Sequence, residues 1–236
     1  MATFVTLPKL TTLDLSANQA KNVEAKDLAD ALRHDKKLIT LNLNWKRIGD
    51  VGAKHLADAL KHNRTIVTLK LLRNNIHDVG AQYFADALKH NTTLNTLELS
   101  ENQIGDIGAQ HLADALKHNM TLTTLDLSEN QIGEVGAQYF ADSLQYNTVT
   151  IIKLTTLYIS ENQIGESGSK YFANALKHNM TLTILGLSDS GIGDVGAQNL
   201  ADALQYNTTL TELNISGNRI ADVGAQYLAD ALEHNT

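Results

Sequence analysis

The sequence predicts an α/β solenoid built from eight similar units. The first observation is a period, because the apolar residue that opens each unit recurs every 28 residues, with one step of 32. These opening residues are Leu10, Leu38, Ile66, Leu94, Leu122, Leu154, Leu182 and Leu210. The second observation is that a strand periodicity and a helix periodicity lie side by side in every unit. A unit this short cannot bury its apolar face alone, so neighbouring units are expected to stack.

The strand comes first in each unit. In the unit that opens at Leu122, the run Leu125, Asp126, Leu127 and Ser128 alternates apolar and polar side chains, as a half-buried strand does. The polar members of such strands, and the residues just after them, should face away from the helices.

An asparagine follows the strand in six of the units. A stacked column of these side chains would satisfy turn backbone groups that are otherwise buried without partners. Lys46 and Ser190 occupy this position in the two remaining units, which puts the local turn hydrogen bonds in question. The six asparagines are Asn18, Asn74, Asn102, Asn130, Asn162 and Asn218.

A helix closes each unit. Ala137, Phe140, Ala141 and Leu144 recur at helical spacing. An acidic residue before the helix, such as Asp106, suits a helix start as a cap or first-turn anion. A glycine in the first turn should let the helix lie close to the strand layer, since it has no Cβ. These glycines are Gly52, Gly80, Gly108, Gly136, Gly168, Gly196 and Gly224.

A second recurrent asparagine follows the helix. We expect it to adopt the left-handed conformation that ends many helices. The surrounding Asn-x-Thr sequence also matches a glycosylation acceptor, which we interpret as a by-product of helix termination unless the chain is secreted. The five asparagines at this phase are Asn63, Asn91, Asn119, Asn179 and Asn207.

The pattern L-x-x-L-x-L-x-x-N followed by I-G-x-x-G-A-x-x-L/F-A-x-x-L covers Leu10 to Asn235 and resembles the leucine-rich repeats of the ribonuclease-inhibitor subfamily. The resemblance implies a right-handed horseshoe with a parallel sheet on the concave face and helices on the convex face. We expect one domain over residues 1–236, with a four-residue insertion near 148–153. Val149, Ile151 and Ile152 in that insertion either form an exposed contact or fold back over the core.

Composition narrows the function. The chain of 236 residues has no cysteine, which excludes disulfides and permits a reducing compartment, and its net charge of −7 argues against a nucleic-acid partner. No run of 18 apolar residues or signal peptide is evident, so we expect a cytoplasmic protein that contacts no membrane. No cofactor or metal is expected. Six histidines share one phase, but helices about 8–10 Å apart place them too far from one another to share a zinc ion.

Candidate binding residues are those that differ between units at concave positions. One group is aromatic, apolar and cationic, and a second is acidic with one tyrosine. The first comprises Trp45, Lys46, Lys70, Leu72 and Arg73, with Arg47 beside them. The second comprises Glu98, Glu101, Asp126, Glu129, Tyr158 and Glu161. An electrically polarised face with tryptophan, tyrosine and arginine is typical of a protein-binding surface.

Each group also has a simpler explanation. Trp45 and Arg73 could stack on each other as an intramolecular cation–π pair. The acidic residues could serve only to solvate the face.

The expected function is recognition of another protein on the concave face, without enzymatic activity. Two alternatives stay open: a GTPase-activating regulator, because the Ran-activating protein is similar to this repeat class, and a consensus-like or designed scaffold with no evolved partner. Neither end of the chain shows a polar capping unit. We therefore expect either an excerpt of a longer array or end-to-end self-association.

Overall fold

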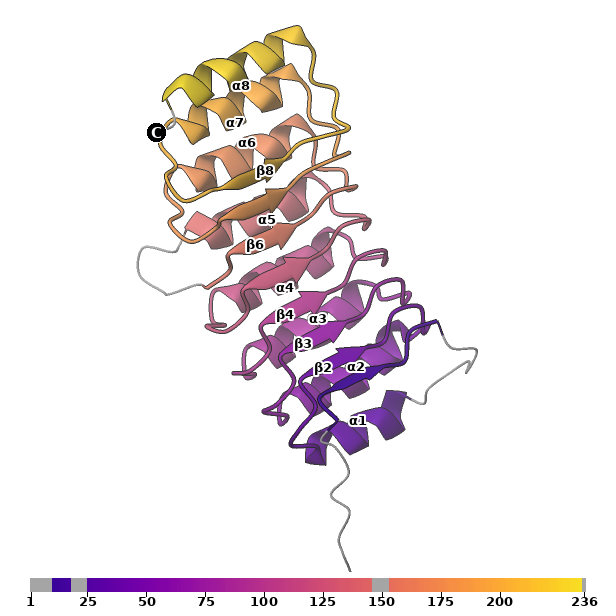
Figure 1. Cartoon of the computed structure of the whole chain (residues 1–236). Helices are drawn as coiled ribbons and strands as arrows, with labels where there is room; N and C mark the ends of the chain where they lie inside the picture. The colour runs from indigo at the N-terminus through magenta and orange to yellow at the C-terminus, as the bar shows by residue number, and fades with distance from the viewer. Residues whose placement is uncertain (1–9, 18–24, 146–152, 235–236) are drawn as a thin grey trace, which may run out of the picture.

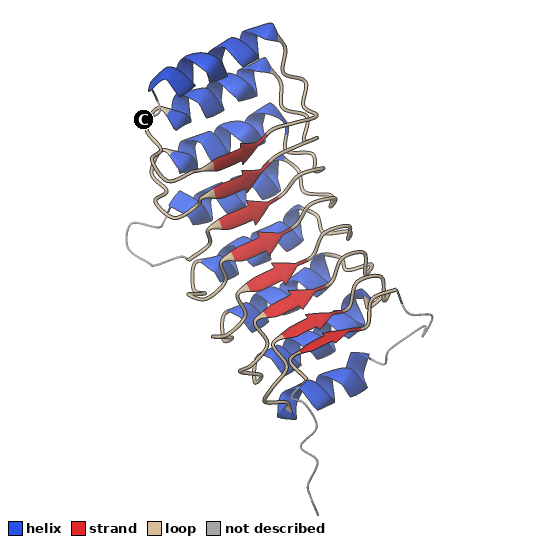
Figure 2. Cartoon of the chain, viewed as in Figure 1, coloured by secondary structure: helices blue, strands red, loops and turns tan. Residues whose placement is uncertain are grey.

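The computed structural model describes residues 10–17, 25–145 and 153–234. Within these residues, eight parallel strands form one open sheet, and a helix follows each strand. The strands make one layer and the helices make a second layer behind it (Figures 1 and 2). Paired strands lie about 4.8 Å apart and packed helices about 8–10 Å apart, so the array curves with the sheet on its concave side. The predicted fold class is confirmed.

Every strand is three residues long. The strands are Thr12–Asp14 (β1), Thr40–Asn42 (β2), Thr68–Lys70 (β3), Thr96–Glu98 (β4), Thr124–Asp126 (β5), Thr156–Tyr158 (β6), Ile184–Gly186 (β7) and Glu212–Asn214 (β8). The helices are Ala25–His34 (α1), Gly49–Leu60 (α2), Asp78–Leu88 (α3), Asp106–Leu116 (α4), Glu134–Gln145 (α5), Gly165–Leu176 (α6), Asp194–Leu204 (α7) and Asp222–His234 (α8).

The register of the sheet aligns equivalent residues of successive units. Thr96 pairs with Thr124 at the usual step of 28 residues, and Thr124 pairs with Thr156 at a step of 32. Side chains at one position of the unit therefore form a row across the sheet. The apolar residues of the expected insertion lie outside the described residues: Val149, Ile151 and Ile152.

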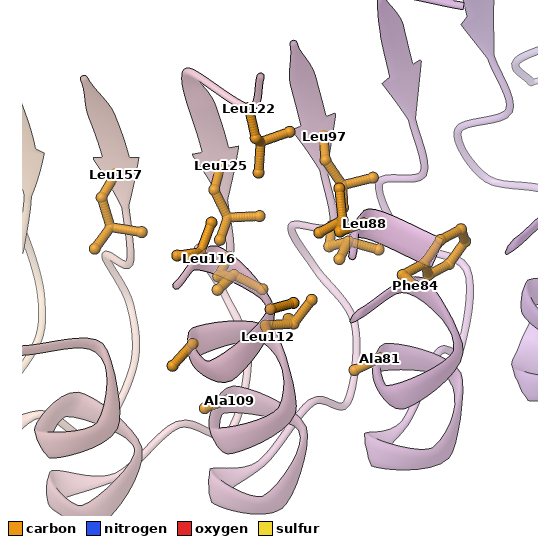
Figure 3. Packing of buried hydrophobic residues seen from close by; sticks show 14 of the residues in the cluster. Ala81, Phe84, Leu88, Leu97, Ala109, Leu112, Leu116, Leu122, Leu125 and Leu157 are labelled. Carbon is orange, nitrogen blue, oxygen red and sulfur yellow. The ribbon is translucent and has the colours of Figure 1, made fainter. Parts of the chain in front are cut away.

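A continuous apolar core fills the space between the two layers. Leu97 and Leu125 point from the sheet toward Phe84 and Leu112 on the helices (Figure 3), and all four are at most 1% exposed. Burial of each such side chain stabilises the fold by about 1.5–3 kcal/mol. The same positions recur in each unit, so the core is one row of equivalent contacts.

The first-turn glycines allow neighbouring helices to approach. A Cβ on Gly108 would lie 2.6 Å from Ile104 Cγ2 in its own turn, 3.1 Å from Ala81 Cβ and 2.8 Å from Asp78 Oδ1. Ala81 and Asp78 belong to α3, the preceding helix. The expectation that glycine brings the helix to the strand layer is therefore corrected, because the close neighbours are the preceding helix and the turn.

The helix-start aspartates cap the following unit. Asp106 lies in the first turn of α4, where its charge suits the helix dipole. Its Oδ1 nevertheless accepts hydrogen bonds from the backbone N–H groups of Gly133 (2.7 Å) and Gly136 (2.9 Å), which start α5. The expected cap is therefore real but acts on the next helix. The same bonds link each of three other aspartates to the unit after it: Asp50, Asp78 and Asp194.

Five of the six strand-exit asparagines form the predicted column, here called the asparagine ladder (Asn74, Asn102, Asn130, Asn162 and Asn218), and the sixth, Asn18, lies outside the described residues. Oδ1 of Asn102 accepts hydrogen bonds from the N–H groups of Asn74 and Ile76, both at 3.0 Å. Its Nδ2 donates to the carbonyl oxygens of Leu71, Leu99 and Ser100. One buried side chain thus satisfies five backbone groups in two neighbouring units.

Lys46 and Ser190 interrupt the ladder but keep its backbone link. The N–H of Lys46 donates to Asn74 Oδ1 at 3.0 Å, and the N–H of Ser190 donates to Asn218 Oδ1 at 2.9 Å. Ser190 Oγ also donates to the carbonyl of Ser188 at 3.0 Å. Both turns are therefore hydrogen-bonded to the unit that follows.

The asparagines after the helices form a second buried column. None of the five has a positive φ, so the expectation of a left-handed helix stop is wrong. Asn119 is 4% exposed, its Nδ2 donates to the Leu88 carbonyl at 2.7 Å, and its Oδ1 accepts from the N–H groups of Thr121 and Leu122. The position requires an amide side chain for hydrogen bonding between units.

Candidate functional site

Two rows of variable side chains cross the sheet face. The first row lies within the strands, where Lys70 pairs with Glu98, Glu98 with Asp126 and Asp126 with Tyr158. The backbones of neighbouring members are therefore about 4.8 Å apart across the sheet. The sheet register brings together the in-strand residues that the sequence singled out, as expected.

The second row, here called the exit row, lies just after the strands. It comprises Trp45, Arg73, Glu101, Glu129, Glu161 and Asp189, all of which have φ between 48° and 64°. The backbone is held in this left-handed conformation by hydrogen bonds to the next unit, such as that from the N–H of Glu101 to the carbonyl of Ser128 at 2.9 Å. Such a conformation costs a non-glycine residue about 1–2 kcal/mol. The exit row is thus an ordered array of side chains on a strained backbone.

Charges of opposite sign meet at the boundary between the third and fourth units. Lys70 Nζ lies 2.9 Å from Glu98 Oε1, and an Arg73 guanidinium nitrogen lies 3.3 Å from Glu101 Oε2. The sequence predicts a face divided into a basic part and an acidic part. The structure modifies that prediction, because both basic side chains that the third unit places on this face, Lys70 and Arg73, are already paired with acids of the fourth.

Trp45 and Arg73 lie against each other. The guanidinium carbon of Arg73 is 4.1 Å from the centre of the Trp45 ring system, which is the cation–π contact named above as the simpler explanation. Trp45 is still 50% exposed, and the Arg73 side chain is 56% exposed. The contact therefore orders both side chains and leaves much of each accessible.

The acidic part of the exit row carries like charges side by side. Burial raises the pKa of Glu129, and the negative charges of Glu101, Glu161 and Asp126 raise it further, while Arg73 has a smaller opposing effect. Like charges at this spacing favour a cationic partner group, whose approach relieves their repulsion.

Tyr158 leans toward the seventh unit. A Cβ on Gly186 would lie 2.9 Å from Tyr158 Cδ1, so the tyrosine ring occupies space that any larger residue at Gly186 would need. This neighbour explains how a bulky side chain fits a row of small and acidic residues.

Two residues of the predicted site are less accessible than expected. Lys46 is only 4% exposed and sits at the ladder position within the stack. Leu72 is half-buried, and its backbone N–H donates a hydrogen bond to Asn44 Oδ1 of the preceding unit at 2.9 Å. The sequence predicts that Lys46 lies on the surface, and the structure shows that it is buried.

A hollow of about 740 Å³ lies beside the basic end of the exit row, and we call it the exit hollow. Its lining combines exit-row residues with residues two positions later in the unit. The lining residues are Trp45, Arg47, Arg73, Asn75, Glu101 and Gln103. Asn75 and Gln103 were not among the sequence candidates, although their shared phase two residues after the exit row could have identified them. Arg47 and Asn75 also have positive φ, at 53° and 58°.

A second hollow, of about 340 Å³, lies at the last described unit between β8, α7 and α8. Leu204, Leu213, Leu228 and Leu232 contribute to its lining, and Leu232 is 67% exposed. The prediction of end-to-end association concerns this surface.

The described residues contain no group of three or more histidine, aspartate or glutamate side chains placed to hold a metal ion. Among the helices of residues 25–145 and 153–234, none has the length and apolarity required to cross a membrane.

Comparison with solved structures returns matches that cover most of this chain. An internalin from Listeria monocytogenes is 21% identical with a TM-score of 0.54, and the match covers 92% of this chain and 58% of the internalin. The leiomodin-1 actin-binding site 2 structure is 17% identical, with coverage of 92% and 91% and a TM-score of 0.42. A tropomodulin C-terminal domain from Caenorhabditis elegans is 14% identical, with coverage of 90% and 93% and a TM-score of 0.44. At these identities the internalin match supports the fold alone.

A search of curated proteins found no match to the sequence. The family model described as Leucine Rich repeat, in contrast, matches seven segments that together span most of the chain. They are residues 34–57, 62–85, 90–113, 118–141, 151–173, 178–201 and 206–229. With this repeated match and the parallel strand-and-helix array described above, the chain belongs to the leucine-rich repeat family.

Proposed function

We propose that the chain is a non-enzymatic recognition module that binds a partner protein on its concave sheet face. The observation that carries this proposal is the exposed pair Trp45 and Arg73, at a position where the next four units have acidic residues. Tryptophan, tyrosine and arginine are the residue types most enriched among binding hot spots. Solenoids of stacked repeats offer extended concave surfaces that serve binding.

The residues proposed to contact the partner form two sets. Trp45, Leu72 and Arg73 supply aromatic, apolar and cationic contacts, and Lys70 adds charge beside them. Tyr158 and the acidic residues complete the surface: Glu98, Glu101, Asp126, Glu129 and Glu161. Lys46 is buried, so we assign it a role in orienting Trp45 rather than in contact.

A cytoplasmic location is part of this proposal. The chain has no cysteine, which suits a reducing compartment. Five Asn-x-Thr sequences have a buried asparagine, between 1% and 4% exposed, whose amide bonds the neighbouring unit. A glycan would replace one of the two N–H groups of the buried amide and could not be accommodated between the units. The chain is therefore expected to fold in a compartment where asparagine is not glycosylated, such as the cytoplasm.

The test is capture of partners from a cytosolic extract, with bound proteins identified by mass spectrometry. The parent chain is compared with the triple variant Trp45→Ala, Lys70→Glu, Arg73→Glu. We expect a protein that the parent retains and the variant loses, because truncation of a hot-spot residue costs about 2 kcal/mol or more.

A matched control carries the same changes away from the sheet face: Tyr206→Ala, Lys54→Glu, Lys170→Glu. All three positions are exposed, so the control has an equal charge change and the same loss of one aromatic side chain. The control should retain the partner. If both variants and the parent retain the same proteins, the concave face is not the binding surface.

A further inference from the structure

The exit hollow contains two arginines in different electrostatic situations. Arg73 is paired with Glu101 and stacked on Trp45. Arg47 is exposed, and among the described residues no carboxylate lies within 4.0 Å of its guanidinium group. Within the described part of the chain, the hollow therefore has one arginine that already binds a carboxylate and one that faces no carboxylate.

Glu101 shows which chemical group the hollow accepts. Its carboxylate reaches Arg73 from the neighbouring unit while the guanidinium carbon lies 4.1 Å from the centre of the Trp45 ring system. A guanidinium in this position keeps donors along its edge, and arginine matches carboxylates with a planar set of N–H groups. An acidic side chain from a partner would meet the same arrangement, with Arg47 added.

The rest of the exit row favours the opposite charge. Glu129 and Glu161 follow Glu101, and the described residues place no basic side chain within 4.0 Å of either carboxylate. A long polyanion that entered the exit hollow would have to lie across this acidic part. The surface is therefore suited to a segment that carries both signs of charge.

We propose that the exit hollow binds an acidic side chain of a partner peptide segment, and that basic side chains of the same segment lie over Glu129 and Glu161. This inference rests on the proposed function and specifies the partner. It gives Glu101 a further role, because the entering carboxylate competes with Glu101 for Arg73.

The strand spacing sets the spacing of the ligand charges. Arg73 and Glu129 are two units apart and Arg73 and Glu161 are three units apart, which corresponds to about 10 Å and about 14 Å. An extended peptide advances about 3.3 Å per residue. The basic residues of the segment should therefore lie about three and four positions from its acidic residue.

Trp45 provides a direct readout, because it is the single tryptophan of the chain and forms one wall of the hollow. The probe is the peptide acetyl-Gly-Glu-Gly-Gly-Lys-Lys-Gly-amide, titrated into the full chain while tryptophan fluorescence is recorded. Isothermal calorimetry supplies a second measurement that does not depend on fluorescence. We expect saturable binding that weakens about tenfold when Gln replaces Glu in the peptide.

Three variants test the assignment of residues. Arg47→Gln and Arg73→Gln should each weaken binding about tenfold, and Arg47→Gln should leave the melting temperature nearly unchanged. Glu101→Gln should strengthen binding severalfold, since it removes the internal competitor. A merely structural role for Glu101 would not produce tighter binding.

Several results would overturn the inference. They are absence of binding by both measurements, equal affinity for the Gln peptide, equal affinity for inorganic phosphate, or weaker binding by Glu101→Gln. Loss of the capture partner in the triple variant, together with any of these results, would leave the proposed function standing and reject the specific ligand.

Discussion

The exit row and the asparagine ladder are adjacent along the chain but differ in almost every physical respect. Arg73 is exposed, has a strained backbone and contacts other side chains. Asn74, the next residue, is fully buried and bonds backbone groups of neighbouring units. The ladder repeats one residue type because its hydrogen bonds are the same in each unit. The exit row varies because the stack needs only its backbone, and this leaves its side chains available for recognition.

The largest effect on stability should come from the ladder. Asn102→Ala removes hydrogen bonds to five backbone groups. The N–H groups of Asn74 and Ile76 and the carbonyl of Leu71 lose the bond outright, and each such loss costs about 1–3 kcal/mol when no water replaces it. The carbonyls of Leu99 and Ser100 keep bonds from Asn130 Nδ2 and the Arg73 N–H. We expect a loss of about 3 kcal/mol or more in the free energy of unfolding, measured by urea denaturation.

The adjacent exit-row variant, Glu101→Ala, is the control for this prediction. It removes one solvent-accessible ion pair and should change the free energy of unfolding by about 1 kcal/mol or less. Equal losses in the two variants would contradict the distinction between the rows.

A smaller loss is expected at the aspartate caps. Asp106→Ala removes the acceptor for the N–H groups of Gly133 and Gly136, and loss of a helix cap costs about 0.5–2 kcal/mol. Asp114→Ala on the same helix, which removes only an exposed ion pair with Lys117, should cost less. The comparison uses thermal unfolding of both variants. A larger effect from Asp114→Ala would show that the cap between units is unimportant.

Trp45→Ala separates stability from binding. Because the contact with Arg73 is exposed, its loss should lower the free energy of unfolding by about 0.5–1 kcal/mol. The free energy of binding to a captured partner should weaken by about 2 kcal/mol or more, measured by calorimetry. If stability falls while the affinity is unchanged, Trp45 and Arg73 only stabilise each other and do not contact the partner.

The smallest effect concerns the acidic part of the exit row. The pKa of Glu129 is raised in the folded chain, so the folded state disfavours the ionised carboxylate. The free energy of unfolding therefore falls as pH rises from the ordinary pKa of glutamate through the raised pKa. Glu129→Gln should therefore stabilise the fold by about 0.5 kcal/mol or less at neutral pH, because solvent screens exposed charges.

The pH dependence checks the cause of that effect. Below the ordinary pKa of glutamate both forms are neutral, so the advantage of Glu129→Gln should disappear in acid. Thermal melts across this pH range would show it. A constant difference at all pH values would mean that charge is not responsible.

The repeat period and the two hydrophobic periodicities were sufficient to predict the architecture, because the same apolar positions recur in each unit. The ladder of Asn74 and its equivalents was also predictable, since a buried turn needs an amide at a fixed phase. The contacts between units were not. Asp106 caps the next helix because of the position of one unit relative to its neighbour, and no local sequence pattern encodes that relative position.

The candidate site was predictable only in part. The position of each variable residue followed from the strand pattern, and the sheet register aligns them as expected. The pairing of Arg73 with Glu101 depends on side-chain geometry across units, and the burial of Lys46 depends on the stack around it. Asn75 and Gln103 share a phase two residues after the exit row, which could have identified their positions. They were missed because the direction of their side chains depends on a turn whose backbone conformation is not evident from residue type.

The aspartate caps give the molecule a direction. Each carboxylate belongs to an earlier unit and serves the helix start of a later one. During synthesis from the N-terminus, a newly made helix therefore meets an acceptor that is already in place on the folded surface behind it. The asparagine ladder runs in the opposite sense, because the N–H groups of Asn74 and Ile76 bond to Asn102 of the next unit. Each added unit therefore receives a helix cap from the unit before it and completes the turn of that earlier unit.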